Sequence, residues 1–533
     1  MFRPPVKAFV NAVFYTMREE GECFEALVTR GDKIWKLTTA EEARDLAREN
    51  GGEIVDLKGA AVLPGFIDAH QHVQAYAENL FKVNLRTVDS VEELKEKIRQ
   101  RAAETPAGQL IQGAGFDQER FSVQEIPTKE DLDEAAPDHP VLITRYCLHV
   151  NVANTKALEM IGVGNSNRQA PMDSVEYRED GEPSGRMGEL AATKIVNAAK
   201  TGDDYARIKD MVAEALKEEI RYGITGIHPI QGKSVNLLES TRVYQDLRDE
   251  GRLPVRIYMG YDEFPPMGVK TGLGDEMVKF GFYKIYTDGS LGARSARFSQ
   301  PYSDDPSQRG VMIHTQEGLN DLIHTAYERD IQIGIHAIGD EAVDMAVTAL
   351  EESYYKNPKE DIRFRLIHAS LIREDLLERM KKLPMMCDVQ PTYVSTNISW
   401  SDSRVGERAG YLFAWKRLVD AGLVLTGSSD APVEPINPLL GIYAAVTRQG
   451  YDGSHPGGWH PENKLTRFEA VSLYTKNGAY ASFEEEIKGT LEEGKLADFA
   501  VLDQDVFRVP ENEIQKIKVV KTYLGAAETY SME

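Results

Sequence analysis

Cysteine is scarce in this chain of 533 residues, which contains only three, Cys23, Cys147 and Cys387. They are scattered and follow no metal-binding spacing, which argues against a disulfide framework and fits a reducing compartment. Long hydrophobic runs are also missing, since no segment approaches the roughly 18 apolar residues that a membrane span needs. Lys7 and Asn11 interrupt the apolar stretch near the N-terminus, so we expect no signal peptide and a cytoplasmic location.

Positive charge is in deficit, because 62 lysines and arginines face 85 aspartates and glutamates, for a formal net charge of -23. A chain this acidic is repelled by phosphate backbones and by anionic lipids. We therefore expect no nucleic acid and no membrane as partners, but a small-molecule substrate. A homodimer would be ordinary for a soluble enzyme of this size.

Two common catalytic motifs are absent from the sequence. No nucleophile elbow of the GxSxG type occurs, which argues against a serine hydrolase of that class. The glycine-rich pieces GVGNSN and GLGDE do not stand between a strand and a helix, so they do not predict a phosphate-binding loop.

The sequence does contain eight short apolar runs, most of them separated by amphipathic helical patterns. Hydrophobic residues make up 42% of the chain, enough for a sizeable core. Eight strands each followed by a helix predict an α/β fold with a (β/α)₈ barrel of the TIM type. The predicted strands are Ala61–Ala69, Ile224–Ile230, Val255–Tyr261, Phe282–Thr287, Ile331–Ile335, Arg363–Ile367, Met385–Val389 and Leu423–Thr426.

The gap between the first and second predicted strands, from about Gln74 to Arg221, is too long for one strand-to-helix connection. We therefore expect an insertion after strand 1, at about residues 75–220, and interpret it as a cap subdomain over the barrel mouth. It contains the strand-like runs GQLIQGAGF and PVLITRYCL and a turn, GEPSGRMGE. The alternative is that the insertion decorates the barrel without touching its site.

The two ends of the chain alternate as short strands with glycine or charged turns between them. This pattern predicts a small β-sandwich domain built from both termini, residues 1–62 and 485–533. The barrel, with its insertion, then occupies residues 63–484.

The run AVLPGFIDAHQHV ends with two histidines one residue apart, His70 and His72. Side chains alternate along a strand with period two, so both imidazoles leave the same face. Two neutral imidazoles that converge from one strand end make half of a transition-metal site. The alternative is a pair of surface or packing histidines.

Polar residues also stand at the ends of later strands. Lys284 lies in FYKIYTDGS, His336 in IGIHAIGD, His368 in RLIHAS and Asp430 in LTGSSDAPV. The C-terminal ends of the strands form the active face of such a barrel. Chance placement of all these residues on one mouth is improbable, so the sequence favours a metal site there.

A histidine pair on strand one, a lysine on four, histidines on five and six and an aspartate on eight form the pattern of the amidohydrolase superfamily. More narrowly, KIYTDGSLGARSA, HAIGD, IHAS and SSDAPVEPINPLLGIYAAVTR resemble the YtcJ-like branch, amidohydrolase family 3, which includes N-substituted formamide deformylases. The resemblance extends from about residue 6 to residue 525. It implies a metal-dependent hydrolase of an amide-type C–N bond.

The resemblance implies a ligand set for one or two divalent ions. His70, His72 and Asp430 would hold one ion and His336 and His368 the other, with Zn²⁺ the expected metal and Mn²⁺, Fe²⁺ or Co²⁺ as alternatives. The resemblance further suggests that Lys284 reacts with carbon dioxide to give a carbamate that bridges the ions. The alternative is that Lys284 is a buried lysine paired with Asp288.

The expected reaction is hydrolysis of an N-formyl or N-acyl amine by metal-activated water, with Asp430 as general base and then general acid. Two alternatives stay open. One is a cyclic amidine deaminase, for which Glu341, five residues after His336, would be the extra acid. The other is a non-catalytic barrel that binds a ligand.

Four further residues are weaker candidates for substrate binding. Asp117, Arg145 and His149 belong to the insertion and line the pocket by resemblance, or act as internal braces. Arg294 follows strand four, where a guanidinium binds a substrate oxygen or pairs with a neighbouring acid. His228 ends strand two, where an outer or packing role is expected.

Overall fold

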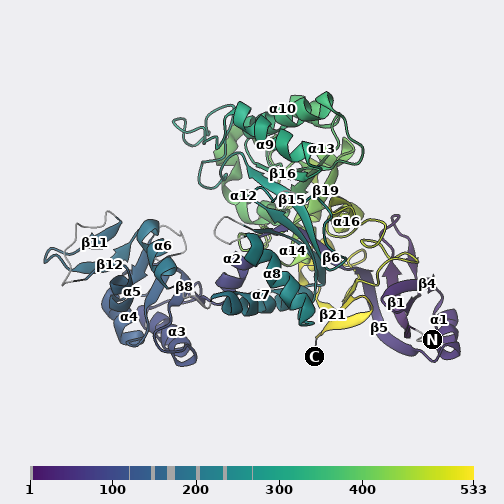
Figure 1. The fold of residues 1–533 in the computed structure, drawn as a ribbon, viewed down its shortest axis with the longest axis horizontal. Coiled ribbons are helices and arrows are strands. Elements are labelled where there is room, and N and C mark those ends of the chain that lie inside the picture. The colour runs from purple at the N-terminus through teal and green to yellow at the C-terminus, as the bar shows by residue number, and fades with distance from the viewer. Residues whose placement is uncertain are drawn as a thin grey trace. The chain divides into compact units, whose positions relative to one another are not determined.

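The computed structural model describes residues 4–118, 121–145, 150–164, 174–199, 204–231, 237–266 and 268–532. The chain forms two compact units, one made of Met1–Ala75 and Val212–Glu533 and the other of Tyr76–Met211 (Figure 1). Within the described ranges, no helix has both the length and the apolar character needed to cross a lipid bilayer.

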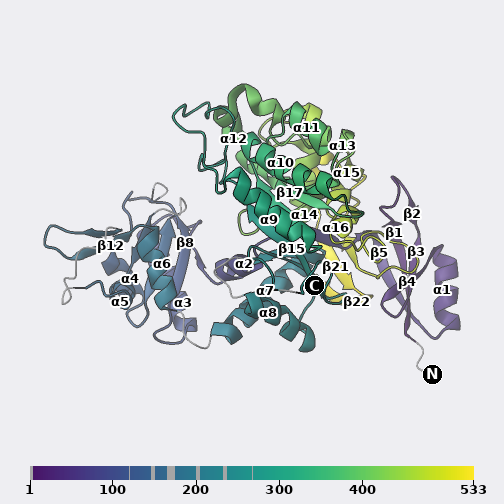
Figure 2. The ribbon, with the colours of Figure 1, turned by 45° about the horizontal axis from the view of Figure 1, so that its top comes forward.

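The first unit contains a sheet of eight parallel strands in the order β19-β18-β17-β16-β15-β14-β13-β6. Helices surround this sheet (Figures 1 and 2), and the architecture confirms the predicted (β/α)₈ barrel. The strands are β6 (Phe66–Gln71), β13 (Ile224–Gln231), β14 (Arg256–Tyr261), β15 (Val278–Tyr286), β16 (Gln332–Ala337), β17 (Phe364–His368), β18 (Met385–Val389) and β19 (Val424–Gly427).

The helices of this unit fill most of the connections between the strands. They are α7 (Asp204–Arg221), whose residues 204–211 belong to the second unit, α8 (Leu237–Asp249), α9 (Gln316–Glu328), α10 (Asp340–Lys356), α11 (Glu374–Met380), α12 (Thr392–Val405), α13 (Trp415–Asp420), α14 (Pro438–Thr447), α15 (Arg467–Leu473) and α16 (Lys476–Ala481). The prediction of a helix after every strand is wrong for β14. In its connection to β15, residues 262–277, the described residues contain no helix.

The first predicted strand is corrected by the structure. The run Ala61–Ala69 divides at Gly65 into the end of β5 (Glu53–Pro64), which belongs to another sheet, and the barrel strand β6. A Cβ on Gly65 would lie 2.1 Å from Thr225 Oγ1, so only glycine fits where the backbone passes this close. The chain therefore changes sheets at this glycine.

The two chain ends contribute strands to one eight-stranded sheet that curls over its own core. Phe9 contacts Phe499 and Tyr523 at ring-centroid distances of 5.0 and 5.1 Å. In the strand order, β5 lies between the strands of Phe9 and Phe499, and β5 and β20 lie between those of Phe9 and Tyr523. The remaining elements are β1 (Val6–Tyr15), β2 (Cys23–Phe24), β3 (Ala26–Arg30), β4 (Lys33–Thr38), α1 (Ala40–Glu49), β20 (Phe499–Leu502), β21 (Val519–Leu524) and β22 (Ala527–Ser531).

The second unit has its own six-stranded sheet, in the order β11-β12-β10-β9-β8-β7. Helices pack on this sheet (Figure 2). The strands are β7 (Val83–Asn84), β8 (Ile111–Phe116), β9 (Val141–Arg145), β10 (Asn151–Ala153), β11 (Val175–Tyr177) and β12 (Pro183–Met187), and the helices are α3 (Val91–Glu104), α4 (Lys129–Ala135), α5 (Thr155–Met160) and α6 (Glu189–Ala198), with α2 (Val73–Leu80) at the junction.

The segment GEPSGRMGE was expected to be a turn, and this is wrong, because it contains strand β12. β12 pairs antiparallel with β10, and Gly185 in its middle has φ +94. A Cβ at that position would lie 2.7 Å from Lys129 Cβ and 2.9 Å from Ala153 O. The glycine thus marks a close backbone approach inside the sheet, not a chain reversal.

Candidate metal centre

The six residues predicted as metal ligands stand at the C-terminal ends of barrel strands. His70 lies in β6 and His72 directly after it, Lys284 in β15, His336 in β16, His368 at the end of β17, and Asp430 three residues beyond β19. Because parallel strands of a barrel end at one mouth, these side chains share that face. His70, Lys284, His368 and Asp430 are buried there, and His72 is partly exposed.

Three of these residues converge on one point. Asp430 Oδ1 lies 3.3 Å from His70 Nε2 and 3.3 Å from His72 Nε2. The backbone fixes this arrangement, because Asp430 N donates to His70 O at 2.8 Å and His72 N donates to Ala431 O at 2.8 Å. These bonds also join the first barrel strand to the segment after the last.

The donor set fits a divalent transition metal. In a tetrahedral site with metal–ligand bonds of about 2.0–2.1 Å, neighbouring ligand atoms lie about 3.3–3.4 Å apart. The two distances from Asp430 Oδ1 to the histidine nitrogens match this spacing, and all three ligand atoms lie within 4.8 Å of one another. Burial, together with the charge of Lys284, lowers the pKa of His70 well below its usual value, so this imidazole is neutral. Burial raises the pKa of the Asp430 carboxyl, but hydrogen bonds with His70 and His72 outweigh this effect and hold that pKa well below its usual range.

Lys284 lies beside this cluster. Its Nζ is 3.5 Å from His70 Nε2, and burial lowers the pKa of Lys284 to about 7. Asp288, which was considered as an alternative partner of Lys284, has other partners. The Asp288 carboxylate accepts hydrogen bonds from the backbone N–H groups of Ile338, Gly339 and Arg297 at 3.1, 2.8 and 2.8 Å.

His336 and His368 form a second pair, with ring centroids 4.4 Å apart. His336 Nε2 lies 3.1 Å from Gly289 O and 3.3 Å from Asp288 Oδ1. His368 Nδ1 lies 2.8 Å from Gln390 Oε1. Histidine ligands commonly use one ring nitrogen for such an outer oxygen and the other for the metal. Nδ1 of His336 and Nε2 of His368 are the nitrogens left for an ion.

A buried ion pair that we did not predict ties these strands together. Arg365 and Asp388 are both fully buried, and Arg365 Nε donates to Asp388 Oδ2 at 2.9 Å. Arg365 Nη2 donates to Ala69 O at 2.7 Å, and Asp388 Oδ1 accepts from Thr426 Oγ1 at 2.7 Å. The pair thus connects the strands that carry His368, Asp430 and His70. In the sequence, the pair is indicated only by a charged residue within each of two predicted apolar strands, Arg365 in Arg363–Ile367 and Asp388 in Met385–Val389.

Two further polar residues support the first strand. Asp68 Oδ1 accepts from the N–H groups of His70 at 3.2 Å and Ser429 at 3.1 Å, and burial raises the pKa of Asp68 to about 7. His228 Nδ1 lies 3.2 Å from Arg365 Nη2, with its ring 5.0 Å from Tyr258. His228 therefore contacts the buried ion pair and an aromatic ring.

The candidates for substrate binding have varied surroundings. Arg294 makes a bidentate ion pair with Asp304, at 3.1 and 2.9 Å, which is the alternative that the sequence left open. In the second unit, Arg145 Nη2 lies 3.6 Å from Asp117 Oδ1. His149 lies outside the described residues.

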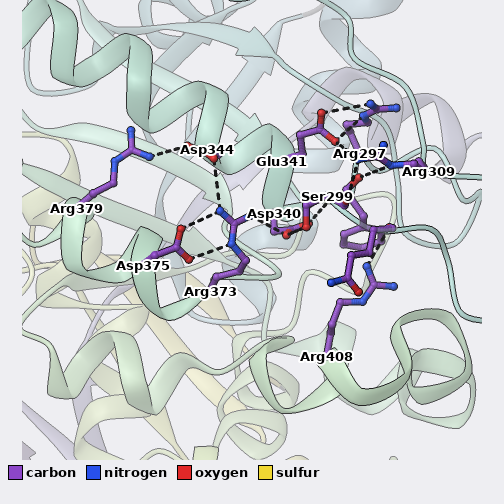
Figure 3. A network of polar contacts seen from close by, with 12 residues as sticks. Arg297, Ser299, Arg309, Asp340, Glu341, Asp344, Arg373, Asp375, Arg379 and Arg408 are labelled. Carbon is purple, nitrogen blue, oxygen red and sulfur yellow. Dashed lines mark hydrogen bonds and ion pairs between the residues drawn. The ribbon is translucent and has the colours of Figure 1, made fainter.

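A network of ion pairs braces the loop after β15 against the start of α10 (Figure 3). Arg297 binds both carboxylate oxygens of Glu341, at 2.9 and 3.2 Å, and Arg309 Nη2 binds Glu341 Oε2 at 3.1 Å. Ser299 N donates to Asp340 Oδ1 at 2.9 Å. Glu341, the acid considered for a deaminase, is therefore held by two arginines.

Comparison with known proteins identifies the family. The family model described as "Amidohydrolase family" matches residues 53–530. The YtcJ protein of Bacillus subtilis (strain 168), whose name classes it with amidohydrolases, is 31% identical over 523 residues, which cover 97% of this chain and 98% of that protein. The N-substituted formamide deformylase of Arthrobacter pascens is 26% identical over 544 residues, which cover 98% and 97%.

A solved structure has the same architecture over nearly the whole length. An uncharacterized metal-dependent hydrolase from Pyrococcus furiosus superimposes with a TM-score of 0.79 at 29% identity, over 94% of this chain and 100% of that chain. The histidine, lysine and aspartate residues at the strand ends, the family match and this likeness agree. The chain belongs to the amidohydrolase family of metal-dependent hydrolases.

Proposed function

We propose that this chain hydrolyses the amide-type C–N bond of an N-formyl or N-acyl amine, with Zn²⁺ as its metal and Asp430 as general base and acid. The observation that carries the proposal is the position of Asp430 Oδ1, 3.3 Å from the Nε2 atoms of both His70 and His72. The similarity to a formamide deformylase over the whole length supports the choice of bond.

The ligands divide into two groups. His70, His72 and Asp430 would hold one ion, and His336 and His368 a second. A bound divalent ion supplies Lewis-acid polarisation of a carbonyl and lowers the pKa of a coordinated water. Only nitrogen and oxygen donors are present in this set, which suits Zn²⁺ and also Mn²⁺, Fe²⁺ or Co²⁺.

Lys284 would join both groups as a carbamate. An ammonium has no lone pair for a metal, whereas a carbamate offers two oxygens. The neutral amine attacks carbon dioxide, a C–N bond forms and one proton is released. Burial lowers the pKa of Lys284 to about 7, so a large share of its amine is neutral at physiological pH.

Asp430 performs the proton transfers of the reaction. Its carboxylate is ionised, because the neighbouring His70 and His72 hold its pKa well below the usual range. It accepts the proton that water loses on adding to the carbonyl carbon. It then gives that proton to the nitrogen as the C–N bond breaks, so that the amine leaves neutral.

The surroundings of Glu341 favour this reaction over deamination of a cyclic amidine. A deaminase needs an acid that is available to protonate the ring or the leaving group. Glu341 instead pairs with Arg297 and Arg309 (Figure 3). We therefore assign Glu341 to the bracing of the loop.

A substrate screen tests the proposal. The purified protein is incubated with N-formyl amines, N-acyl amines and cyclic amidines, and the release of formate, acetate and ammonia is measured. We expect formate or acetate, and a loss of about 10²–10⁴-fold in kcat for Asp430→Asn. Metal content is measured for both proteins, and native mass shows whether Lys284 carries the added carboxyl group.

Other outcomes would overturn the proposal. Release of ammonia without formate or acetate would assign the site to a deaminase. Stoichiometric metal without turnover of any compound would favour the ligand-binding barrel.

A further inference from the structure

The two oxygens of Asp430 have different partners. Oδ1 faces the histidines of β6, at 3.3 Å from each Nε2. Oδ2 accepts a hydrogen bond from the hydroxyl of Tyr393 at 2.6 Å. One carboxylate thus has a metal-facing side and a protein-facing side.

Tyr393 is held firmly enough to impose this division. It lies in the first turn of α12, which begins three residues after the last residue of β18. Its ring stacks on the imidazole of His368, at 6.4 Å between centroids and 14° between planes, and contacts Phe413 at 6.3 Å.

The same helix contacts the Asp430 loop a second time. One turn after Tyr393, Thr396 Oγ1 donates to Glu434 Oε1 at 2.6 Å. Ser395 Oγ donates to Gln449 O at 2.6 Å, beyond α14. α12 is therefore hydrogen-bonded to the segment after β19 through more than one residue.

Asp430 needs such support for two physical reasons. Its φ is +56, a left-handed backbone conformation that is uncommon for residues other than glycine and that the surroundings maintain. The χ2 torsion of an aspartate is broad and does not fix the carboxylate plane by itself. Without a partner for Oδ2, the carboxylate is free to turn both oxygens toward the histidines.

We propose that Tyr393 is a positioning residue for the hydrolysis proposed above, in which its hydroxyl holds Oδ2 so that Oδ1 alone faces the metal side of the site. This inference rests on the proposed function. It assigns Tyr393 no contact with the substrate, because it acts through Asp430.

The test removes only the hydroxyl, with Tyr393→Phe, which keeps the stacking on His368. We expect kcat to fall about 10–100-fold at nearly constant KM, as for other partners of metal ligands, and a chelator to remove the metal about tenfold faster. Tyr443→Phe is the matched control, since the hydroxyl of the buried Tyr443 donates to Gly450 O at 3.2 Å. Thermal unfolding of each variant reports whether the fold is kept.

The two arms separate this inference from the proposed function. The chelator measurement needs no substrate. A wild type that holds metal but turns over no substrate would contradict the proposed reaction. The rates of metal loss from wild type and Tyr393→Phe would then still test whether Tyr393 positions Asp430. A Tyr393→Phe variant that matches wild type in kcat and in metal loss overturns the inference alone. A wild type that holds no metal overturns both.

Discussion

One ion pair in the barrel and one in the inserted unit differ sharply in their burial. In the barrel, Arg365 and Asp388 form an ion pair with no exposed surface. In the inserted unit, Arg178 and Glu130 pair at 2.6 Å with 42% and 53% of their side chains exposed. A buried pair is expensive to break because it leaves an unpaired charge, whereas an exposed pair contributes little. The difference indicates that the Arg365–Asp388 pair holds barrel strands in place, whereas the Arg178–Glu130 pair lies on a solvated face.

This difference separates two tasks. The candidate ligands stand at strand ends that the buried pair ties together, so the chemistry depends on a rigid part of the molecule. We expect substrate preference to depend on the inserted unit, in which Asp117 directly follows β8 and Arg145 ends β9. Variants in the two regions should therefore differ in which property they change.

The largest effect is expected for Arg365→Met. Removal of the guanidinium leaves Asp388 buried without its counter-charge, which costs about 3–5 kcal/mol in the free energy of unfolding. All four tryptophans, Trp35, Trp400, Trp415 and Trp459, belong to the barrel-bearing unit. Urea unfolding followed by tryptophan fluorescence therefore measures this unit specifically.

Arg178→Met is the matched control in the inserted unit. Its exposed pair with Glu130 contributes little to the free energy of unfolding, so unfolding followed by circular dichroism should hardly change. A loss for Arg178→Met as large as that for Arg365→Met would contradict the contrast between the two regions.

A second effect concerns pH and the buried Glu484. Burial raises the pKa of Glu484, but the charges of Lys488 and Lys279 outweigh this effect and lower that pKa from 4.5 to about 2. Because the folded-state pKa is lowered, the stabilisation is present above about pH 4.5 and is lost as the pH falls toward 2. Its size at neutral pH is about 3 kcal/mol.

Glu484→Gln tests this linkage. At pH 7 the variant should be less stable than wild type by about 3 kcal/mol, and the difference should shrink as the pH is lowered from about 5 to 3. Fluorescence-detected urea unfolding across this range measures it. A difference that stays constant with pH would show that the charge of Glu484 is not the cause.

The smallest effect is expected in the inserted unit. If Arg145 contacts the substrate, Arg145→Gln raises KM about tenfold, which corresponds to about 1.4 kcal/mol of lost binding. Metal content should not change, because none of the ligands belongs to this unit. An unchanged KM would assign Arg145 to its contacts with Asp117 and Gln118.

The sequence was sufficient to predict the barrel and the positions of the six candidate ligands. Strand periodicity is a local property, and the predicted run Met385–Val389 coincides with β18. A histidine at the end of a buried strand also follows from local order. The barrel then brings such ends together, which is a consequence of the fold class and needs no knowledge of side-chain contacts.

Other features depend on contacts between distant segments and were not predictable in this way. The division of the first apolar run at Gly65 depends on the approach of Thr225. Asp388, the partner of Arg365, lies on the next strand, and Tyr393, the partner of Asp430 Oδ2, lies on α12. A charge or a tyrosine in the sequence does not name its partner.

Elemental analysis of the purified wild type beside a His70→Asn/His72→Asn double variant tests the central claim most directly. The account predicts one or two equivalents of a divalent transition metal per wild-type chain, and the loss of at least one of them from the double variant. A wild type without stoichiometric metal that still hydrolyses an amide, or a double variant with an unchanged metal content, would contradict it.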